Sequence, residues 1–186
     1  NLLADRLPSH ESVADASSDR TTTDGSVNAT DALVAYDDDR QAKFWKMRKA
    51  GLPILLSRTG DEKHWPFVED TAVPAENLPE YVADIQELFT EYDTFASYYA
   101  HAGPGVLHIR PLLNLKSEDG VETMLEISDA VTDLVIEYGG SVSGEHGDGR
   151  ARSTWNKKLY GDELWESFQQ LKAAFDPQQL LNPGNV

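Results

Sequence analysis

The sequence predicts an α+β fold whose centre runs in the order βαββαβ, a ferredoxin-like core with an antiparallel sheet and both helices on one face. Three observations predict it. Two segments carry apolar residues at three- and four-residue spacing, as amphipathic helices do. Short β-rich segments flank them, and a Gly-Pro-Gly run at 103–105 separates two of these segments, as in a hairpin. Because each helix buries one apolar stripe on the sheet, the other sheet face is left for a partner.

The N-terminal part is predicted from composition and from helix-ending residues. Residues 1–30 are rich in Ser, Thr and Asp, so we expect a loop-rich or disordered segment there and a folded domain over 31–186. The elements expected next are a strand at 32–36, a helix at 38–50 and a strand at 54–57. Gly51 and Pro53 are expected to end the helix.

The central elements follow from hydrophobic periodicity. A helix is expected at 76–92, where Tyr81, Ile85 and Phe89 share one face, and a second at 121–138, ended by two glycines. The expected strands are 67–73, 95–100, 106–115 and 141–144. A last helix is expected at 162–175, so that the chain ends with a C-terminal helical extension.

Composition excludes several functions. The 186 residues include 32 acidic and 16 basic ones, a net charge of −16, which opposes binding to nucleic-acid phosphates. Cysteine is absent, so disulfides, thiolate zinc sites and cysteine nucleophiles are excluded. We interpret the acidic charge as a solvated surface of the halophilic type, stabilised by screening at high salt. No apolar run reaches the roughly 18 residues of a membrane span.

Two glycine-rich segments, 99–111 and 139–150, gather three of the five histidines. His101 and His108 end and begin the two hairpin strands, and residues that face each other there have Cβ atoms about 5 Å apart, which suits two imidazoles on one ion. Two surface histidines beside a turn would give the same pattern. Glu145 and His146 follow the last strand and would point to opposite sides if that strand continued. A glutamate that simply satisfies the glycine-rich loop is the alternative.

These segments, together with the tail 175–186, resemble the C-terminal domain of FAD-linked oxidases. The family includes D-lactate dehydrogenases, glycolate oxidase subunits and D-2-hydroxyglutarate dehydrogenases, and the subgroup patterns HAGxGxLHxRP and SGEHGDGxARS are similar to this chain. The resemblance runs from residue 44 to the end. It implies FAD as cofactor, held mainly by a separate upstream flavin domain, and we therefore expect a fragment of a larger flavoenzyme that is inactive in isolation.

The resemblance also implies roles for the polar residues. Residues matching His101, His108 and Glu145 hold a divalent metal in the family, and the residue matching His146 is the general base. Ligation by two histidines and a carboxylate admits zinc, manganese or iron. In simple ferredoxin-like order the strands of His101 and Glu145 lie on opposite sheet edges, so their convergence is implied by the resemblance alone.

Two arginines and one asparagine complete the candidate site. The family uses the arginine matching Arg48 for the substrate carboxylate, although an arginine near a helix C-terminus also counters the helix dipole. Arg110 follows His108 by two residues and so shares its strand face, within reach of the same substrate. Asn182 belongs to the closing Leu-Asn-Pro-Gly motif, which returns to the flavin domain in the family; an ordinary turn asparagine is the alternative.

The sequence departs from the hydroxyglutarate-type pattern HxGDGNLHxN. Pro104, Val106 and Arg110 replace its aspartate and two asparagines, so contacts made by those groups do not carry over. Val68 stands near the position at which that type has a substrate-binding lysine, and the absence of such a lysine there disfavours a dicarboxylate substrate. We therefore expect D-lactate or glycolate as the type of substrate.

The leading hypothesis is the substrate half of an FAD-dependent D-2-hydroxy acid dehydrogenase, located in the cytoplasm or peripheral on the inner face of the membrane. Its expected partners are the flavin domain and an electron acceptor, either a quinone, a cytochrome or an iron–sulfur protein. A metal-dependent hydrolase and a non-catalytic docking module are the alternatives. The lack of a helical HExxH motif argues against the hydrolase.

Overall fold

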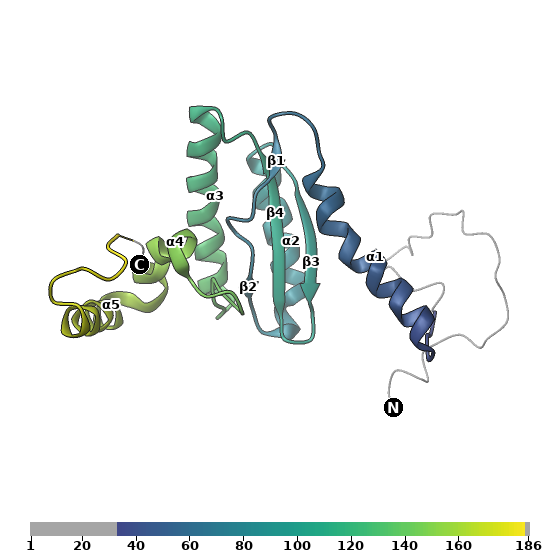
Figure 1. The fold of residues 1–186 in the computed structure, drawn as a ribbon. Helices are drawn as coiled ribbons and strands as arrows, with labels where there is room; N and C mark the ends of the chain where they lie inside the picture. Colours follow the sequence, from purple (N-terminus) through teal and green to yellow (C-terminus); the bar gives the residue numbers. More distant parts are fainter. Residues whose placement is uncertain (1–32, 185–186) are drawn as a thin grey trace. The chain divides into compact units, whose positions relative to one another are not determined.

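The computed structural model of the chain describes residues 33–184 (Figure 1), and these divide into two compact units between Leu52 and Pro53. The predicted disorder of 1–30 lies outside the described residues, and the predicted domain boundary at 31 stays a prediction. In the first unit, residues 33–36 form no regular structure where a strand was expected.

Helix α1 spans Asp38–Leu56 and does not end at Gly51 and Pro53, so the predicted strand at 54–57 is wrong. A proline lacks an N–H donor and its ring crowds the preceding turn, but its own carbonyl can still accept. The amide of Ser57 donates to the carbonyl of Pro53 at 3.0 Å, which continues the helical bonding beyond the proline.

The sheet of the second unit is organised around β4 (Val106–Leu113), which pairs antiparallel with each of the other described strands. β3 (Ala96–His101) pairs along one edge of β4, as the hairpin prediction expected. On the other edge β2 (Thr71–Ala72) pairs with residues 106–107, and β1 (Lys63–His64) pairs with residues 112–113. The strand predicted at 67–73 is thus reduced to β2, while β1 was not predicted.

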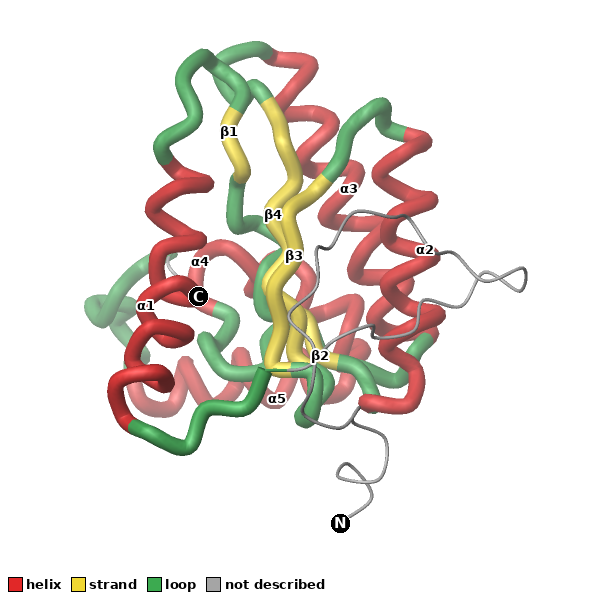
Figure 2. Tube along the Cα trace, turned by 90° about the vertical axis from the view of Figure 1, so that its right-hand side faces the viewer, coloured by secondary structure: helices red, strands yellow, loops and turns green. Residues whose placement is uncertain are grey.

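Helices α2 (Leu78–Glu91) and α3 (Glu118–Glu137) lie side by side against one sheet face (Figure 2). A short 3₁₀ turn, Ala75–Asn77, precedes α2. Ser117 caps α3 by accepting the amide of Gly120 at 3.1 Å, so the helix begins three residues before its predicted start. The core between helices and sheet contains these buried residues: Tyr81, Ile85, Phe89, Leu107, Ile109, Leu113, Ile127, Val131 and Val135.

Strand alternation then decides where polar residues of β4 lie. Because Leu107 and Ile109 face the helices, His108 and Arg110 project from the opposite sheet face. Both are nonetheless buried, at 2% and 8% exposure. The site described below is built on this second face.

The strand predicted at 141–144 is reduced to a single bridge between Ser141 and Ala72, beside β2. After the bridge the chain continues beside residues 70–72, with the amide of Gly144 donating to the carbonyl of Asp70 at 2.7 Å. Gly144 packs so tightly that a Cβ there would lie 2.9 Å from a methyl carbon of Val106. The α+β class is confirmed, whereas the ferredoxin-like detail stays a prediction.

The C-terminal region is helical, as expected. α4 (Gly149–Arg152) and a 3₁₀ turn (Ser153–Trp155) lead into α5 (Asn156–Phe175), which begins earlier than the predicted 162. Gly161 has φ of 78° and breaks α5 into two helical pieces, so the prediction matches its second piece. None of the helices in the described part of the chain is long and apolar enough to cross a membrane.

Candidate functional site

The hairpin of β3 and β4 places three aromatic rings on the sheet face opposite the helices. Tyr99 pairs directly with His108, and their rings stack at a centroid distance of 4.3 Å. His101 pairs with Val106, so the prediction that the two histidines face each other is wrong by two residues in register. They are diagonal neighbours instead, with ring centroids 5.2 Å apart at 85°.

Glu145 reaches the same point from the segment that follows the Ser141 bridge. Its Oε1 lies 3.2 Å from Nε2 of His101 and 3.7 Å from Nε2 of His108. The three ligand atoms lie within 4.8 Å of one another. Glu145 comes close to the two histidines because the preceding residue, Gly144, packs directly on Val106 of β4 and Ala72 of β2, an approach that strand order alone does not contain.

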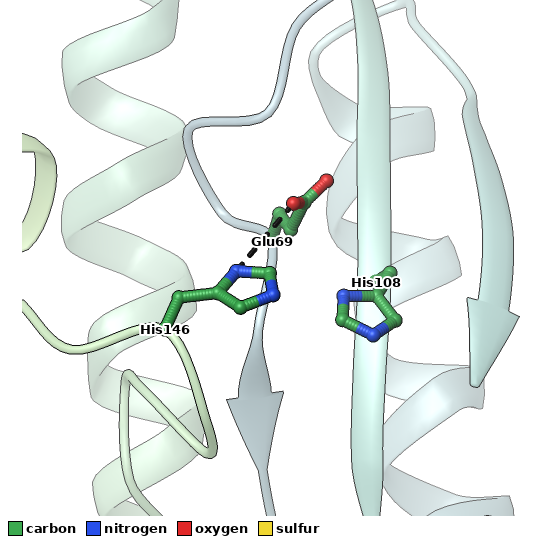
Figure 3. A group of neighbouring side chains, drawn as sticks. All are labelled: Glu69, His108 and His146. Carbon is green, nitrogen blue, oxygen red and sulfur yellow. Dashed lines mark ion pairs between the residues drawn. The ribbon is translucent and has the colours of Figure 1, made fainter. Parts of the chain in front are cut away.

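The His146 ring also packs against the ring of His108. The two rings stack with centroids 5.3 Å apart and an interplanar angle of 24°. Nδ1 of His146 is 3.6 Å from Oε1 of Glu69. Figure 3 marks this contact with a dashed line. The predicted strand does not continue through Glu145 and His146, so strand alternation does not set their directions. Both side chains reach His108.

Glu69 was not singled out from the sequence, and the structure makes it a neighbour of both His146 and Arg110. Its Oε2 forms an ion pair with Nη2 of Arg110, and both side chains are 9% exposed. Glu69, His108 and His146 form a second group with metal-ligand spacing, which shares His108 with the first. Two adjacent acids at 69–70 inside a segment predicted as a buried strand were the signal that could have drawn attention to them.

Asp70 is the second residue missed, and it supports the loop that carries Glu145 and His146. Its side chain is fully buried and accepts the Ser143 hydroxyl at 2.7 Å, the Glu145 amide at 3.1 Å and the His146 amide at 2.8 Å. Burial alone would raise the pKa of Asp70, but these hydrogen bonds together lower it below its ordinary value. Asp70 is therefore a charged carboxylate at neutral pH.

The electrostatics of His108 suit a ligand. Burial lowers the pKa of His108, and the nearby carboxylates of Glu69 and Glu145 offset this only in part. The ring is therefore uncharged at neutral pH, the form that binds metals. Its Nδ1 is buried and has no hydrogen-bond partner among the residues that the structure describes. Two imidazoles and a carboxylate within 4.8 Å form a donor set that fits a divalent ion.

Two further residues of the second unit, Asn182 and Val68, lie outside this cluster. Arg48 is on α1 in the first unit, and Asn182 is exposed in the loop after α5, with φ of 48°. Their predicted substrate and cofactor roles stay predictions. Val68 belongs to the buried core at 5% exposure, so its side chain packs with the helices and not with the histidines.

Comparison with known proteins gives a consistent result. A family model described as FAD linked oxidases, C-terminal domain, matches residues 10–186. A D-2-hydroxyglutarate dehydrogenase of Haemophilus influenzae is 40% identical over 144 residues, covering 77% of this chain and 14% of that protein. The glycolate oxidase subunit GlcD of Escherichia coli is 32% identical over 156 residues, covering 84% and 30%. A D-lactate dehydrogenase of Archaeoglobus fulgidus is 32% identical over 162 residues, covering 87% and 34%.

The chain thus spans between 14% and 34% of the length of these relatives. Relatives named for hydroxyglutarate are among the matches, so the expectation against a dicarboxylate, which depended on Val68, gains no support from them.

Proposed function

The chain belongs to the family of FAD-linked oxidase C-terminal domains, and from that premise we propose that it binds substrate and transfers a proton in a flavin-dependent dehydrogenase of D-2-hydroxy acids. One observation carries the proposal. Two imidazoles and a carboxylate meet at one point, and a third imidazole, that of His146, stacks beside them. The names of the relatives support D-lactate, glycolate and D-2-hydroxyglutarate as the substrates to test.

The implied cofactors divide the chemistry with the protein. FAD, when bound, accepts the hydride from Cα, and a divalent ion, when bound, polarises the hydroxyl as a Lewis acid. His101, His108 and Glu145 would hold the ion, with zinc, manganese or iron as candidates. His101 and Glu145 are about half exposed, so this side of the cluster is accessible to a hydroxy acid and to a flavin held elsewhere.

His146 would take the hydroxyl proton as the hydride leaves Cα. Glu69 faces its Nδ1 at 3.6 Å, and a carboxylate on that side favours the tautomer that carries its proton on Nδ1. Nε2 is then the nitrogen that accepts the substrate proton. The His146 side chain is 40% exposed, which lets a substrate reach it.

The carboxylate of the substrate needs a cationic partner, and Arg48 and Arg110 are the two candidates. Arg110 is committed through Nη2 to Glu69, while its buried Nε has no hydrogen-bond partner among the described residues. A guanidinium offers five donors, so pairing with Glu69 leaves others for the substrate. Asn182 would contact the flavin domain, and a quinone, a cytochrome or an iron–sulfur protein would reoxidise the flavin.

Substitutions in the full-length enzyme test the division of roles. His146→Ala should lower turnover about 10²–10⁴-fold, which is the usual contribution of a general base, and should leave bound metal in place. His101→Ala or His108→Ala should instead remove the ion, since two ligands hold a borderline divalent metal poorly. His64→Gln serves as the matched control, because His64 is a buried histidine that contacts the Arg110 carbonyl and lies outside the cluster.

The measurements are metal content by elemental analysis and the bleaching of flavin absorbance on addition of each hydroxy acid. Loss of metal in His146→Ala, with metal and rate both retained in His101→Ala, would show that the roles are assigned wrongly. A full-length protein that binds no flavin would remove the dehydrogenase proposal altogether.

A further inference from the structure

The loop that carries Glu145 and His146 is attached to the sheet by one carboxylate. Asp70 accepts hydrogen bonds from the Ser143 hydroxyl and from the consecutive amides of Glu145 and His146. The Asp70 side chain is fully buried, and its backbone has φ of 76°. A left-handed conformation is uncommon outside glycine, and it ends the ladder that β2 would otherwise extend.

This attachment has a geometric consequence for the two functional side chains. When two consecutive amides converge on one acceptor, the side chains that follow them are free to diverge. Glu145 accordingly turns to His101, whereas His146 turns to Glu69. Glu145 and His146 thus approach His108 separately and do not compete for one position.

The energetics favour the same conclusion. Hydrogen bonds to a charged carboxylate are roughly twice as strong as neutral ones, and a buried carboxylate without them is very costly. Asp70 therefore favours the one loop conformation that supplies its donors. Residues 142–148 form no helix and no strand. Val142 in the core and the hydrogen bond from Arg152 to the Gly147 carbonyl also hold this loop, but it is Asp70 that accepts the hydrogen bonds from the amides of Glu145 and His146.

We propose that Asp70 is the positioning residue that holds Glu145 in place as a metal ligand and His146 in place as the proton acceptor, both at once. This inference rests on the proposed function. It assigns Asp70 no contact with substrate. Partners behind metal ligands typically change metal affinity or activity by about 10–100-fold when they are substituted.

The test uses the full-length enzyme with Asp70→Asn, which keeps the size of the side chain but turns an amide N–H₂ toward the loop's own N–H donors. Zn²⁺ affinity is measured by competition with a chelator, and kcat and KM are measured with excess Zn²⁺ present. Asp84→Asn is the matched control: Asp84 accepts a hydrogen bond from Tyr138 between α2 and α3, away from the loop. Ser143→Ala removes only one of the three donors to Asp70.

In Asp70→Asn we expect the Kd for Zn²⁺ to rise about 10–100-fold and kcat to stay low even at saturating Zn²⁺. Asp84→Asn should lower the thermal midpoint while leaving Zn²⁺ affinity and kcat unchanged, and Ser143→Ala should show a smaller loss than Asp70→Asn. Full recovery of kcat by added Zn²⁺ would overturn the inference, because Asp70 would then act through Glu145 alone. So would a lowered thermal midpoint with unchanged Zn²⁺ affinity and kcat, which is the result of a purely structural role.

The two proposals fail in different ways. Wild-type enzyme that binds Zn²⁺ but oxidises none of the hydroxy acids would refute the proposed function, and weaker Zn²⁺ binding in Asp70→Asn would still support the positioning of Glu145. Wild-type enzyme that neither binds Zn²⁺ nor oxidises a hydroxy acid would overturn both.

Discussion

The close packing of Gly144 against Val106 and Ala72 predicts what an added methyl group would cost. In Gly144→Ala, the new Cβ would lie 2.9 Å and 3.3 Å from the two methyl carbons of Val106 and 3.1 Å from Cβ of Ala72. Carbon atoms in contact normally lie about 3.5–4.0 Å apart, so something must shift. Overpacking of this kind costs about 1–3 kcal/mol, and we expect that loss in the free energy of unfolding.

A double-mutant cycle with Val106→Ala tests the cause. Val106→Ala removes both methyl carbons that clash, and alone it costs about 0.8 kcal/mol for each carbon lost, plus a cavity contribution. In that background Gly144→Ala should cost clearly less than it does alone, because two of the three close contacts are gone and only Cβ of Ala72, at 3.1 Å, remains. The measurement is urea denaturation of the four variants. Gly103→Ala is the control, since a Cβ there meets no atom within 4 Å.

Additive costs, within about 0.5 kcal/mol, would refute the reasoning, because independent sites behave that way. The Gly144→Ala cost would then have to come from the backbone or from contact with Ala72 on β2, and not from contact with Val106 on β4.

Two further predictions concern solution conditions. The thermal midpoint of the chain should rise between about 0.1 M and 2 M salt. The chain has 32 acidic and only 16 basic residues, and screening relieves the repulsion among the excess negative charges. A flat or falling trend would contradict the idea of salt adaptation. The folded-state pKa of Asp70 is lowered, so its stabilisation is complete above the ordinary carboxyl pKa and is lost as the pH falls through the folded value. The difference in unfolding free energy between wild type and Asp70→Asn should therefore shrink from neutral pH to about pH 3, and a constant difference would count against it.

Long periodic segments could be predicted well from the sequence. The stripe through Tyr81, Ile85 and Phe89 set α2, and the glycines at 103 and 105 set the hairpin. Helix ends were less certain because capping decides them: Ser117 starts α3 before its apolar pattern begins. The C-terminal end of α1 was predicted too early, because Pro53 was expected to end the helix and α1 continues through it to Leu56.

The site was predictable as a set of residue types but not as a geometry. The histidines and Glu145 were identified from their motifs, and the structure brings them together. The hairpin register differs from the prediction by two residues, because the turn length fixes the register and the Gly-Pro-Gly signal alone does not give that length. Glu69 and Asp70 were missed because they stand in a segment whose apolar neighbours predict a strand, and only the left-handed φ of Asp70 explains why that strand breaks.

Because β1, β2 and β3 all pair with β4, the candidate metal ligands differ in how easily the backbone that carries them can open. Elements with many ladder partners open only near global unfolding, whereas loops without regular structure open at much lower free energy. His108 is on β4 and His101 on its hairpin partner, while Glu145 is on the loop between the Ser141 bridge and α4. Two ligands thus belong to paired strands of the sheet and one to a segment without regular structure. An ion held at this point would leave when the loop lifts Glu145 away, with both imidazoles still in place to receive the next ion.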